Sequence, residues 1–230
     1  MNQVTDQQII EILRKEAVPA LGCTEPVACA LACAKCKEVL GSVPERLDVL
    51  VSGNIYKNGM GVGIPGTGMV GLPIAAALGA VCGKSEYGLE VLKEVNLGDN
   101  LQRAKDMLGQ VTVSLKEDAP DKLYAEALAT KGNDTVKVII AHTHTNIVLV
   151  EKNGEEIFKR EFRLDTSKPE DKGPELSVKR IWDFVHEVDV KDIEFVLQGA
   201  EMNKAISAEG LNSEYGLQIG KTLKENIDKG

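Results

Sequence analysis

Cys23 and Glu25 are the residues whose types and spacing most directly allow acid–base or nucleophilic chemistry. Cys23 immediately precedes a predicted helix, and the N-terminus of a helix stabilises negative charge. This position lowers the pKa of a thiol and favours the reactive thiolate. Glu25 can give or take a proton, although a glutamate in the first turn of a helix is commonly only a favourable partner of the helix dipole. The pair is therefore a candidate catalytic site.

A second polar cluster, residues 142–146 (HTHTN), lies where two predicted strands meet. His144 can act as a base, a ligand or a substrate anchor, because histidine changes its charge near neutral pH. A histidine at a strand end in a polar turn is more often only exposed to solvent. The residues alone leave both interpretations open.

Three further cysteines, Cys29, Cys33 and Cys36, have the C-x3-C-x2-C spacing of the iron–sulfur motif of radical S-adenosylmethionine enzymes. Those motifs lie in loops, whereas the residues between these cysteines are mainly alanine, leucine and lysine, which are good helix formers. On a helix the outer two thiols are about 10 Å apart along the axis, at about 1.5 Å per residue. We therefore expect the three cysteines to be small buried packing residues.

The stretch from Gly53 to Gly71, GNIYKNGMGVGIPGTGMVG, is rich in glycine, and its apolar residues follow neither a helical nor a strand period. Glycine permits positive φ and close approach to the main chain, so the N–H groups of such a segment can bind an anion. An alanine-rich apolar helix with Pro73 in its first turn follows, and a glycine loop at a helix N-terminus is a common anion site. The alternative is a tight connection between a strand and a buried helix.

Periodicity and capping signals predict the other elements of the first half. A capping box of Thr5 and Gln8 begins a helix that ends by Pro19, and Thr24 and Asp99 are expected to cap two later helices. The expected ranges are a helix from 24 to about 41, a strand at 46–52, an apolar helix at 72–83, and helices near 86–95 and 99–109.

The second half changes in character. Short β-rich runs between 111 and 164, separated by turn signals, predict an antiparallel meander, and a polar loop at 165–175 precedes further helices from Ser177. This order predicts an α+β fold in which helices pack on one face of an antiparallel sheet and the glycine-rich loop leads into a buried helix. We expect one domain, which can divide into subdomains of about 1–110 and 111–230.

Composition excludes several classes of function. The 230 residues carry a net charge of −8 with a pI near 5.1, which argues against nucleic acid or an anionic membrane as a partner. The sequence contains no secretion signal and no apolar run of membrane length, so we expect a cytoplasmic protein. Five cysteines, an odd number with four of them in residues 23–36, are not a secreted disulfide framework.

Four segments resemble the N-terminal half of the L-cysteine desulfidase family, also called serine dehydratase alpha-like proteins. They are GCTEPVACALA at 22–32, KNGMGVGIPGTGMVGLPIAAALGA at 57–80, HTNIV at 144–148 and LNSEYGLQIGKTLKE at 211–225. The similarity runs in order along essentially the whole chain, and the long glycine motif is highly specific to that family.

The resemblance implies a lyase that converts L-cysteine to pyruvate, ammonia and sulfide, using an oxygen-sensitive [4Fe-4S] cluster and no pyridoxal phosphate. One iron would bind the leaving group as a Lewis acid while a base removes the α-proton. By the same comparison Cys23, with Glu25 beside it, is the candidate base or a switchable cluster ligand. The residues implied to bind the substrate, L-cysteine or L-serine, are Thr24, Lys57, Asn58, Gly66, Thr67, Gly68, His144, Thr145 and Asn146.

The chain departs from the family pattern in two respects. Family members are longer, and the cysteines that hold the cluster belong to a C-terminal half that this sequence does not contain. We therefore expect the cluster ligands to come from that half or from a separate subunit, and we expect exposed apolar surface and a homo-oligomer. In addition, His142 and Thr143 replace glycines that usually precede HTNIV, so His142 can compete with His144 for its role.

Two alternatives remain open on the sequence. The chain can be a non-catalytic amino-acid-binding or regulatory module that retains the glycine loop. It can also be a self-contained iron–sulfur protein that uses Cys23, Cys29, Cys33 and Cys36, which predicts a brown isolated chain.

Overall fold

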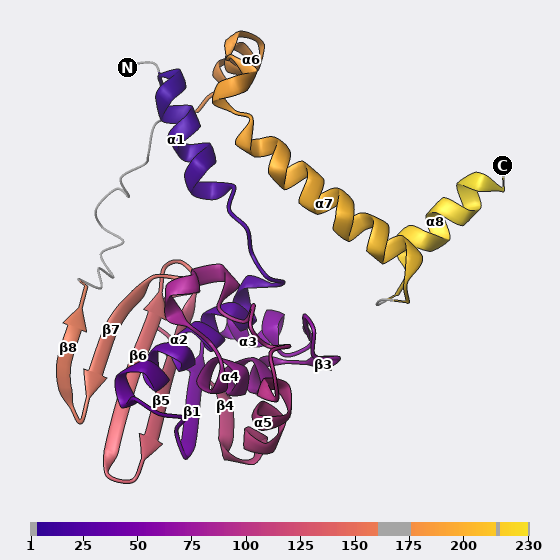
Figure 1. The fold of residues 1–230 in the computed structure, drawn as a ribbon. Coiled ribbons are helices and arrows are strands. Elements are labelled where there is room, and N and C mark those ends of the chain that lie inside the picture. Colours follow the sequence, from indigo (N-terminus) through magenta and orange to yellow (C-terminus); the bar gives the residue numbers. More distant parts are fainter. Residues whose placement is uncertain (1–3, 161–175, 215–216, 230) are drawn as a thin grey trace. The chain divides into compact units, whose positions relative to one another are not determined.

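The computed structural model describes residues 4–160, 176–214 and 217–229 (Figure 1). Its contacts divide the chain into two units: Ala20–Ser167, here called the sheet unit, and Met1–Pro19 with Lys168–Gly230, here called the helical unit. A division near residue 110 is not found, because strand β1 before that position pairs with β4 and β5 after it. The predicted polar loop at 165–175 and the end of the last predicted strand lie outside the described residues.

The sheet unit contains a six-stranded sheet in the order β4-β1-β5-β6-β7-β8. Neighbouring strands from β1 through β5 to β8 are antiparallel, whereas β1 and β4 are parallel. The prediction that 111–116 belongs to the meander is therefore wrong, since β4 lies at the far edge beside β1. The strands are β1 (Arg46–Val51), β4 (Val111–Leu115), β5 (Tyr124–Lys131), β6 (Asp134–Ala141), β7 (Ile147–Lys152) and β8 (Glu155–Lys159).

Helices α2 (Thr24–Leu40) and α4 (Leu72–Val81) cover one face of this sheet, as Figure 1 shows. The covered face of β5 carries only alanine, at positions 125, 127 and 129, and these small side chains let α2 lie close to the strand. Branched side chains fill the same face of β1 and β6. The predicted α+β fold, with helices packed on a largely antiparallel sheet, is confirmed.

The two covering helices touch at small residues. A Cβ atom added to Gly79 of α4 would lie 2.2 Å from the carbonyl oxygen of Ala30 in α2, so no larger residue fits there. Gly83, after α4, is similarly close to Ala34. This contact fixes the position of α2, whose N-terminus carries Cys23 and Glu25.

The glycine-rich stretch is more regular than its sequence indicates. It folds into a short helix, α3 (Gly53–Gly59), and a two-stranded hairpin of β2 (Gly63–Ile64) and β3 (Met69–Val70). Ser52 caps α3 by accepting a hydrogen bond from the Ile55 amide, and Ile55 is buried. The serine cap and the buried Ile55 stabilise this short helix. Its glycines break the apolar periodicity, so the sequence pattern did not predict it.

Several helices differ from the sequence prediction in where they begin or end, or in type. Cys23, not Thr24, occupies the N-cap of α2, and residues 85–90 form a 3₁₀ helix where an α-helix near 86–95 was expected, with a non-helical kink at Gly88. The helix predicted at 99–109 is α5 (Asn100–Met107), followed by a 3₁₀ turn at Leu108–Gln110. Asp99 is its N-cap residue but makes no side-chain capping bond.

The helical unit consists of α1 (Asp6–Glu16), α6 (Val178–Glu187), α7 (Phe195–Asn212) and α8 (Ile219–Asp228), with a 3₁₀ turn at Val190–Asp192. The predicted capping box of Thr5 and Gln8 is present on α1. The buried Arg180 of α6 donates from Nε to the carbonyl of Val4 at 2.6 Å and pairs with Asp6, which joins α6 to the start of α1. Among the described residues, no helix is long and apolar enough to cross a membrane.

Candidate functional site

The thiol of Cys23 and the carboxylate of Glu25 form the centre of the site. Cys23 adopts an extended backbone at the N-cap of α2, and Glu25 lies in the first turn of that helix. The Cys23 Sγ atom donates a hydrogen bond to Glu25 Oε2 at 2.8 Å, and the Thr24 hydroxyl donates to the same oxygen at 3.4 Å. All three residues are partly exposed, so a small molecule can reach them.

The structure reverses the expected ionisation of Cys23. Its pKa is raised, chiefly by burial and then by the hydrogen bond that the thiol donates to Glu25. The pKa of Glu25 is lowered, first because it accepts that hydrogen bond, although burial opposes the effect. The helix dipole therefore does not dominate here, because the nearest carboxylate accepts a hydrogen bond from the thiol and would repel a thiolate. At neutral pH the pair is a thiol beside a carboxylate.

Helix α3 brings a third residue to the pair. Asn58 Nδ2 donates a hydrogen bond to Glu25 Oε1 at 3.1 Å, so each carboxylate oxygen has a donor. This contact also lowers the pKa of Glu25. Lys57, the neighbouring residue, is exposed, and its ammonium group makes no hydrogen bond or ion pair with any residue that the structure describes.

The turn between β6 and β7 carries His142 and His144, and the structure gives the two side chains different surroundings. His144 is partly buried, and burial lowers its pKa, while the charge of Glu25 acts in the opposite direction. His142 has a positive φ of 71°, and its Nδ1 lies 2.7 Å from the carboxylate of Asp121. His144 is therefore the histidine that is electrostatically coupled to Glu25, and it is neutral near pH 7.

The glycine loop lies against the motif that carries Cys23. Gly22 has a φ of 81°, and a Cβ atom there would lie 2.8 Å from the Pro65 side chain. Gly66 (φ 77°) is equally restricted, since its Cβ would meet the Asn96 amide at 2.6 Å, whereas the Cβ of Gly68 (φ 64°) would point into open space. Two segments distant in sequence, 22–25 and 65–68, thus form one surface.

Thr67 has a structural role inside that loop. Its buried hydroxyl donates to the Ile64 carbonyl at 2.7 Å and accepts from the Met69 amide at 2.9 Å. The Thr67 amide is bonded to the same carbonyl. Within the described residues, the amides of Gly66 and Gly68 are not used in these turn contacts, so they are the loop donors available to an anion.

Asn146 and Thr145 lie in the turn that carries His144. Asn146 donates from Nδ2 to the Ala141 carbonyl at 2.9 Å and accepts from Arg160 at 2.7 Å, which closes the turn 142–146. Thr145 is exposed, and its methyl group lies 3.8 Å from where a Cβ of Gly88 would be. The Asn146 side chain therefore supports the turn that carries His144.

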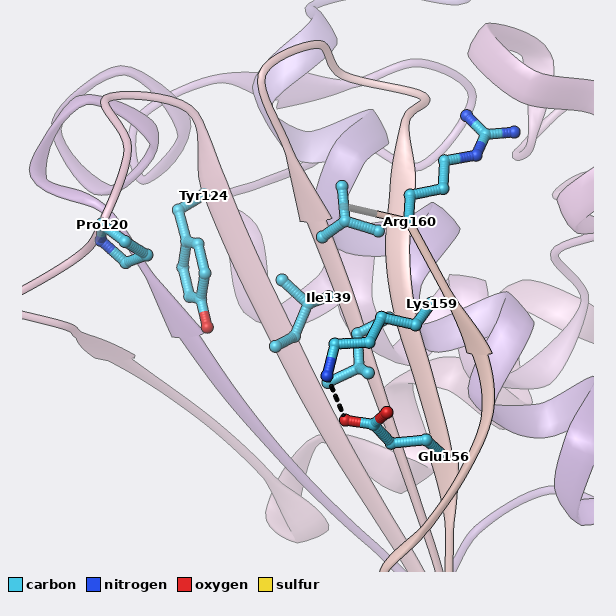
Figure 2. A pocket seen from close by; sticks show the side chains of 8 residues that line it. Pro120, Tyr124, Ile139, Glu156, Lys159 and Arg160 are labelled. Carbon is cyan, nitrogen blue, oxygen red and sulfur yellow. Dashed lines mark hydrogen bonds and ion pairs between the residues drawn. The ribbon is translucent and has the colours of Figure 1, made fainter. Parts of the chain in front are cut away.

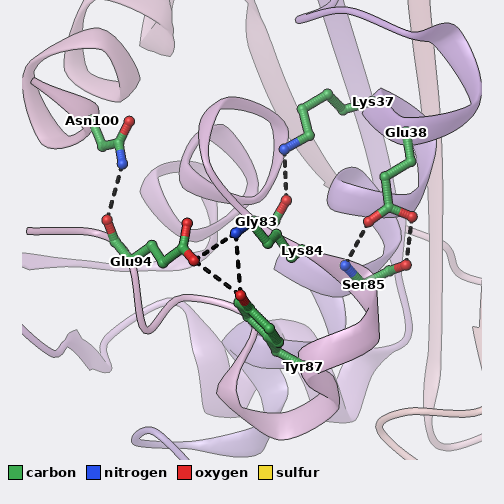
Figure 3. Close-up of polar contacts among 8 residues, drawn as sticks. All are labelled: Lys37, Glu38, Gly83, Lys84, Ser85, Tyr87, Glu94 and Asn100. Atoms are coloured by element: carbon green, nitrogen blue, oxygen red, sulfur yellow. Dashed lines mark hydrogen bonds and ion pairs between the residues drawn. The ribbon is translucent and has the colours of Figure 1, made fainter. Parts of the chain in front are cut away.

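Residues 84–96 form a further wall of the site that sequence reasoning missed. The Leu21 amide donates to the Leu89 carbonyl, which ties this segment to the approach to Cys23. Figure 3 shows how the segment is held: Lys84 donates to Glu94 at 2.7 Å and to the Tyr87 hydroxyl, which itself donates to Glu94. These bonds join residues three to ten positions apart. Because this spacing follows neither a helical nor a strand period, the sequence pattern did not predict the network.

The other cysteines do not form a cluster site. Cys29, Cys33 and Cys36 are fully buried on α2, as the packing interpretation predicts, and Cys82 is also buried. Burial raises the pKa of Cys29 to about 12 and that of Cys33 well above its ordinary value. The described residues contain no group of three or more histidine, cysteine or acidic side chains placed to hold a metal ion. Since Cys23 is the one partly exposed thiol, these cysteines do not fit a [4Fe-4S] cluster as a ligand set.

The sequence is similar to curated bacterial proteins named UPF0597 protein. A relative from Parabacteroides distasonis is 45% identical over 229 residues, which are 97% of this chain and 52% of the relative. Relatives from Dichelobacter nodosus and Oleidesulfovibrio alaskensis are 45% and 46% identical over 99% and 96% of this chain, and over 53% and 51% of their own lengths. The chain therefore spans about half the length of the curated relatives that it matches. No protein-family model and no solved structure matches it.

Proposed function

We propose that this chain is the amino-acid-binding and proton-transferring part of a lyase that eliminates sulfide from L-cysteine, giving pyruvate, ammonia and sulfide. The observation that carries the proposal is the hydrogen bond from Cys23 Sγ to Glu25 Oε2. A thiol that passes its own proton to a carboxylate while it accepts the α-proton can serve as a proton relay, with the carboxylate as the net base. The resemblance of GCTEP, the glycine motif and HTNIV to L-cysteine desulfidases is the second support.

The proposed chemistry is a proton relay through this pair, made of two coupled transfers. As the α-C–H bond of the substrate breaks, Cys23 Sγ accepts the α-proton and Glu25 accepts the proton that the thiol held. The electron pair of the C–H bond forms the Cα–Cβ double bond, and the sulfide leaves from Cβ. The resulting 2-aminoacrylate becomes its imine, which water hydrolyses to pyruvate and ammonia. Glu25 is suited to its part because it is ionised at rest and needs no prior deprotonation.

The substrate would be bound by the surface around the pair. Its carboxylate suits the amides of Gly66 and Gly68, which are available for an anion, with the exposed Lys57 nearby in sequence on α3. The neutral His144 can accept a hydrogen bond from the substrate ammonium group. Thr67 and Asn146 act indirectly, since their side chains are used to shape the loop and the turn.

The leaving sulfide needs an electrophile, and the resemblance assigns this to an iron–sulfur cluster outside this chain. The described cysteines do not form its ligand set, so the proposal places those ligands in the remaining half of the longer relatives or in a separate subunit. Two exposed apolar stripes of the helical unit support a polypeptide partner. Residues Val178, Ile181, Trp182 and Val185 share one face of α6, and Ile219, Leu223 and Ile227 share one face of α8.

Anaerobic co-expression with the polypeptide encoded immediately downstream tests the proposal. We expect iron–sulfur absorbance and pyruvate release from L-cysteine only when both polypeptides are present. A stable complex that binds L-cysteine or L-serine without turnover would contradict the proposal and favour the amino-acid-binding module. A brown isolated chain after anaerobic reconstitution would instead favour the self-contained iron–sulfur protein.

A further inference from the structure

A groove with cationic and apolar walls lies beside α2, on the part of the sheet that the helix leaves uncovered. Helix α2 packs on β5 and β6, and the groove extends beyond it over β7 and β8. Its walls include Lys35 and Val39 of α2, Ile147 and Val150 of β7, and Phe158 and Arg160 at β8. The volume is about 420 Å³, which is within the usual range for small-molecule sites.

The charged side chains that line the groove are all cationic. Lys35 and Arg160 line it, and no carboxylate is among its lining residues. Arg160 is oriented by Asn146, whose Oδ1 accepts one of its N–H groups at 2.7 Å, and among the residues that the structure describes its guanidinium makes no other hydrogen bond. Lys35 is partly neutralised by Glu38 at 3.3 Å, but Glu38 is also bonded to the amide and hydroxyl of Ser85. Arg160 is therefore the principal anion donor.

The apolar walls restrict the rest of the ligand. Val150 is buried and Ile147 is partly buried, while Phe158 stays 41% exposed, so the floor is apolar and the outer wall is open. Thr145 also lines the groove. We propose that this groove binds a small aliphatic carboxylate, with its anionic end at Arg160 and its chain along Ile147 and Val150.

A neighbouring pocket shows why this groove is preferred. The pocket in Figure 2 also touches Arg160, but it lies over Tyr124 and Ile139 and has a volume of about 170 Å³. Its Lys159 is already paired with Glu156 at 2.6 Å. That pocket has less room and a neutralised rim, so an anion gains less there.

Arg160, the principal donor, belongs neither to the Cys23–Glu25 pair nor to the residues assigned to the substrate of the lyase, so this proposal can fail or hold separately from the lyase. Methyl-labelled protein titrated with hexanoate tests it by NMR. We expect saturable shifts of the Ile147 and Val150 methyl signals, and no such shifts with hexylamine. Arg160→Gln should weaken hexanoate binding at least about tenfold, since a charge-assisted contact is lost.

Lys159→Gln is the matched control, because it removes the same charge one residue away without touching the groove. Its hexanoate affinity should equal that of the unmodified chain. The proposal is overturned by an absence of saturable shifts, by equal binding of hexylamine, or by Arg160→Gln and Lys159→Gln having the same effect.

Discussion

Cys23 Sγ lies 2.8 Å from Glu25 Oε2, and Asn58 occupies the other oxygen of the same carboxylate at 3.1 Å. The proton between thiol and carboxylate therefore stays on sulfur, because the donor contacts favour an ionised Glu25 while burial disfavours a thiolate. This arrangement differs from that of a free reactive cysteine, and it explains how a helix N-terminus can carry a protonated thiol.

The first prediction concerns the reactivity of Cys23. Iodoacetamide should label it slowly at neutral pH, and the rate should rise with an inflection above the ordinary pKa of cysteine, because the pKa of Cys23 is raised. Glu25→Gln should move this inflection to lower pH, since the repelling carboxylate is lost. Rates followed by mass spectrometry from about pH 6 to 10 measure both inflections. Glu38→Gln, at the other end of α2, is the control, and an inflection that Glu25→Gln leaves unchanged would contradict the assignment.

The second prediction concerns stability in alkali. Burial holds the pKa of Cys29 at about 12 and raises those of Cys33 and Cys36, so the folded chain keeps these protons at a pH where the unfolded thiols lose them. Stability from this source is complete below the unfolded pKa and is lost as pH rises toward the folded values. Above about pH 9 the free energy of unfolding should fall by about 4 kcal/mol per pH unit from these three thiols.

Urea unfolding at several pH values measures that slope. Cys33→Ala should reduce it by about a third, because one of three linked protons is removed. Cys23→Ala is the control, since that residue is partly exposed and should change the slope less. Equal slopes for Cys33→Ala and the unmodified chain would show that these thiols do not carry the effect.

The third prediction concerns the contact between α2 and α4. Gly79→Ala should destabilise the chain by about 3 kcal/mol or prevent folding, because the new methyl group meets the Ala30 backbone at 2.2 Å. Gly199→Ala is a matched change in helix α7, where nothing lies within 4 Å of the added atom. It should instead stabilise by about 0.5–1 kcal/mol through helix propensity. Equal melting temperatures for the two variants would contradict the packing described here.

The sequence was informative wherever one local rule decided the structure. The capping box of Thr5 and Gln8, the alanine-rich α2 with buried cysteines and the strand at 46–51 all follow from spacing and propensity. The partner of β4 could not be predicted, because parallel pairing with β1 is a contact between distant segments. Helix α3 was hidden because glycine obscures periodicity, although Ser52 and Ile55 supplied a cap and an anchor.

The same distinction holds for the site. The sequence identified Cys23, Glu25 and His144 as candidates from residue type and position. It could not predict their ionisation, because the pKa of Cys23 depends on where the Glu25 side chain points. Nor could it assign Asp121 to His142, or the network of Lys84, Tyr87 and Glu94, since these contacts depend on the folded loops.

The most direct test of the central claim is pyruvate release from L-cysteine by the anaerobically reconstituted two-part protein, with and without Cys23→Ala. If Cys23 accepts the α-proton, turnover should fall at least about 100-fold, as expected for the loss of a general base. Cys29→Ala removes a buried thiol from the same helix and should keep most of the activity. Full turnover by the Cys23→Ala protein would contradict the proposed role of the Cys23–Glu25 pair.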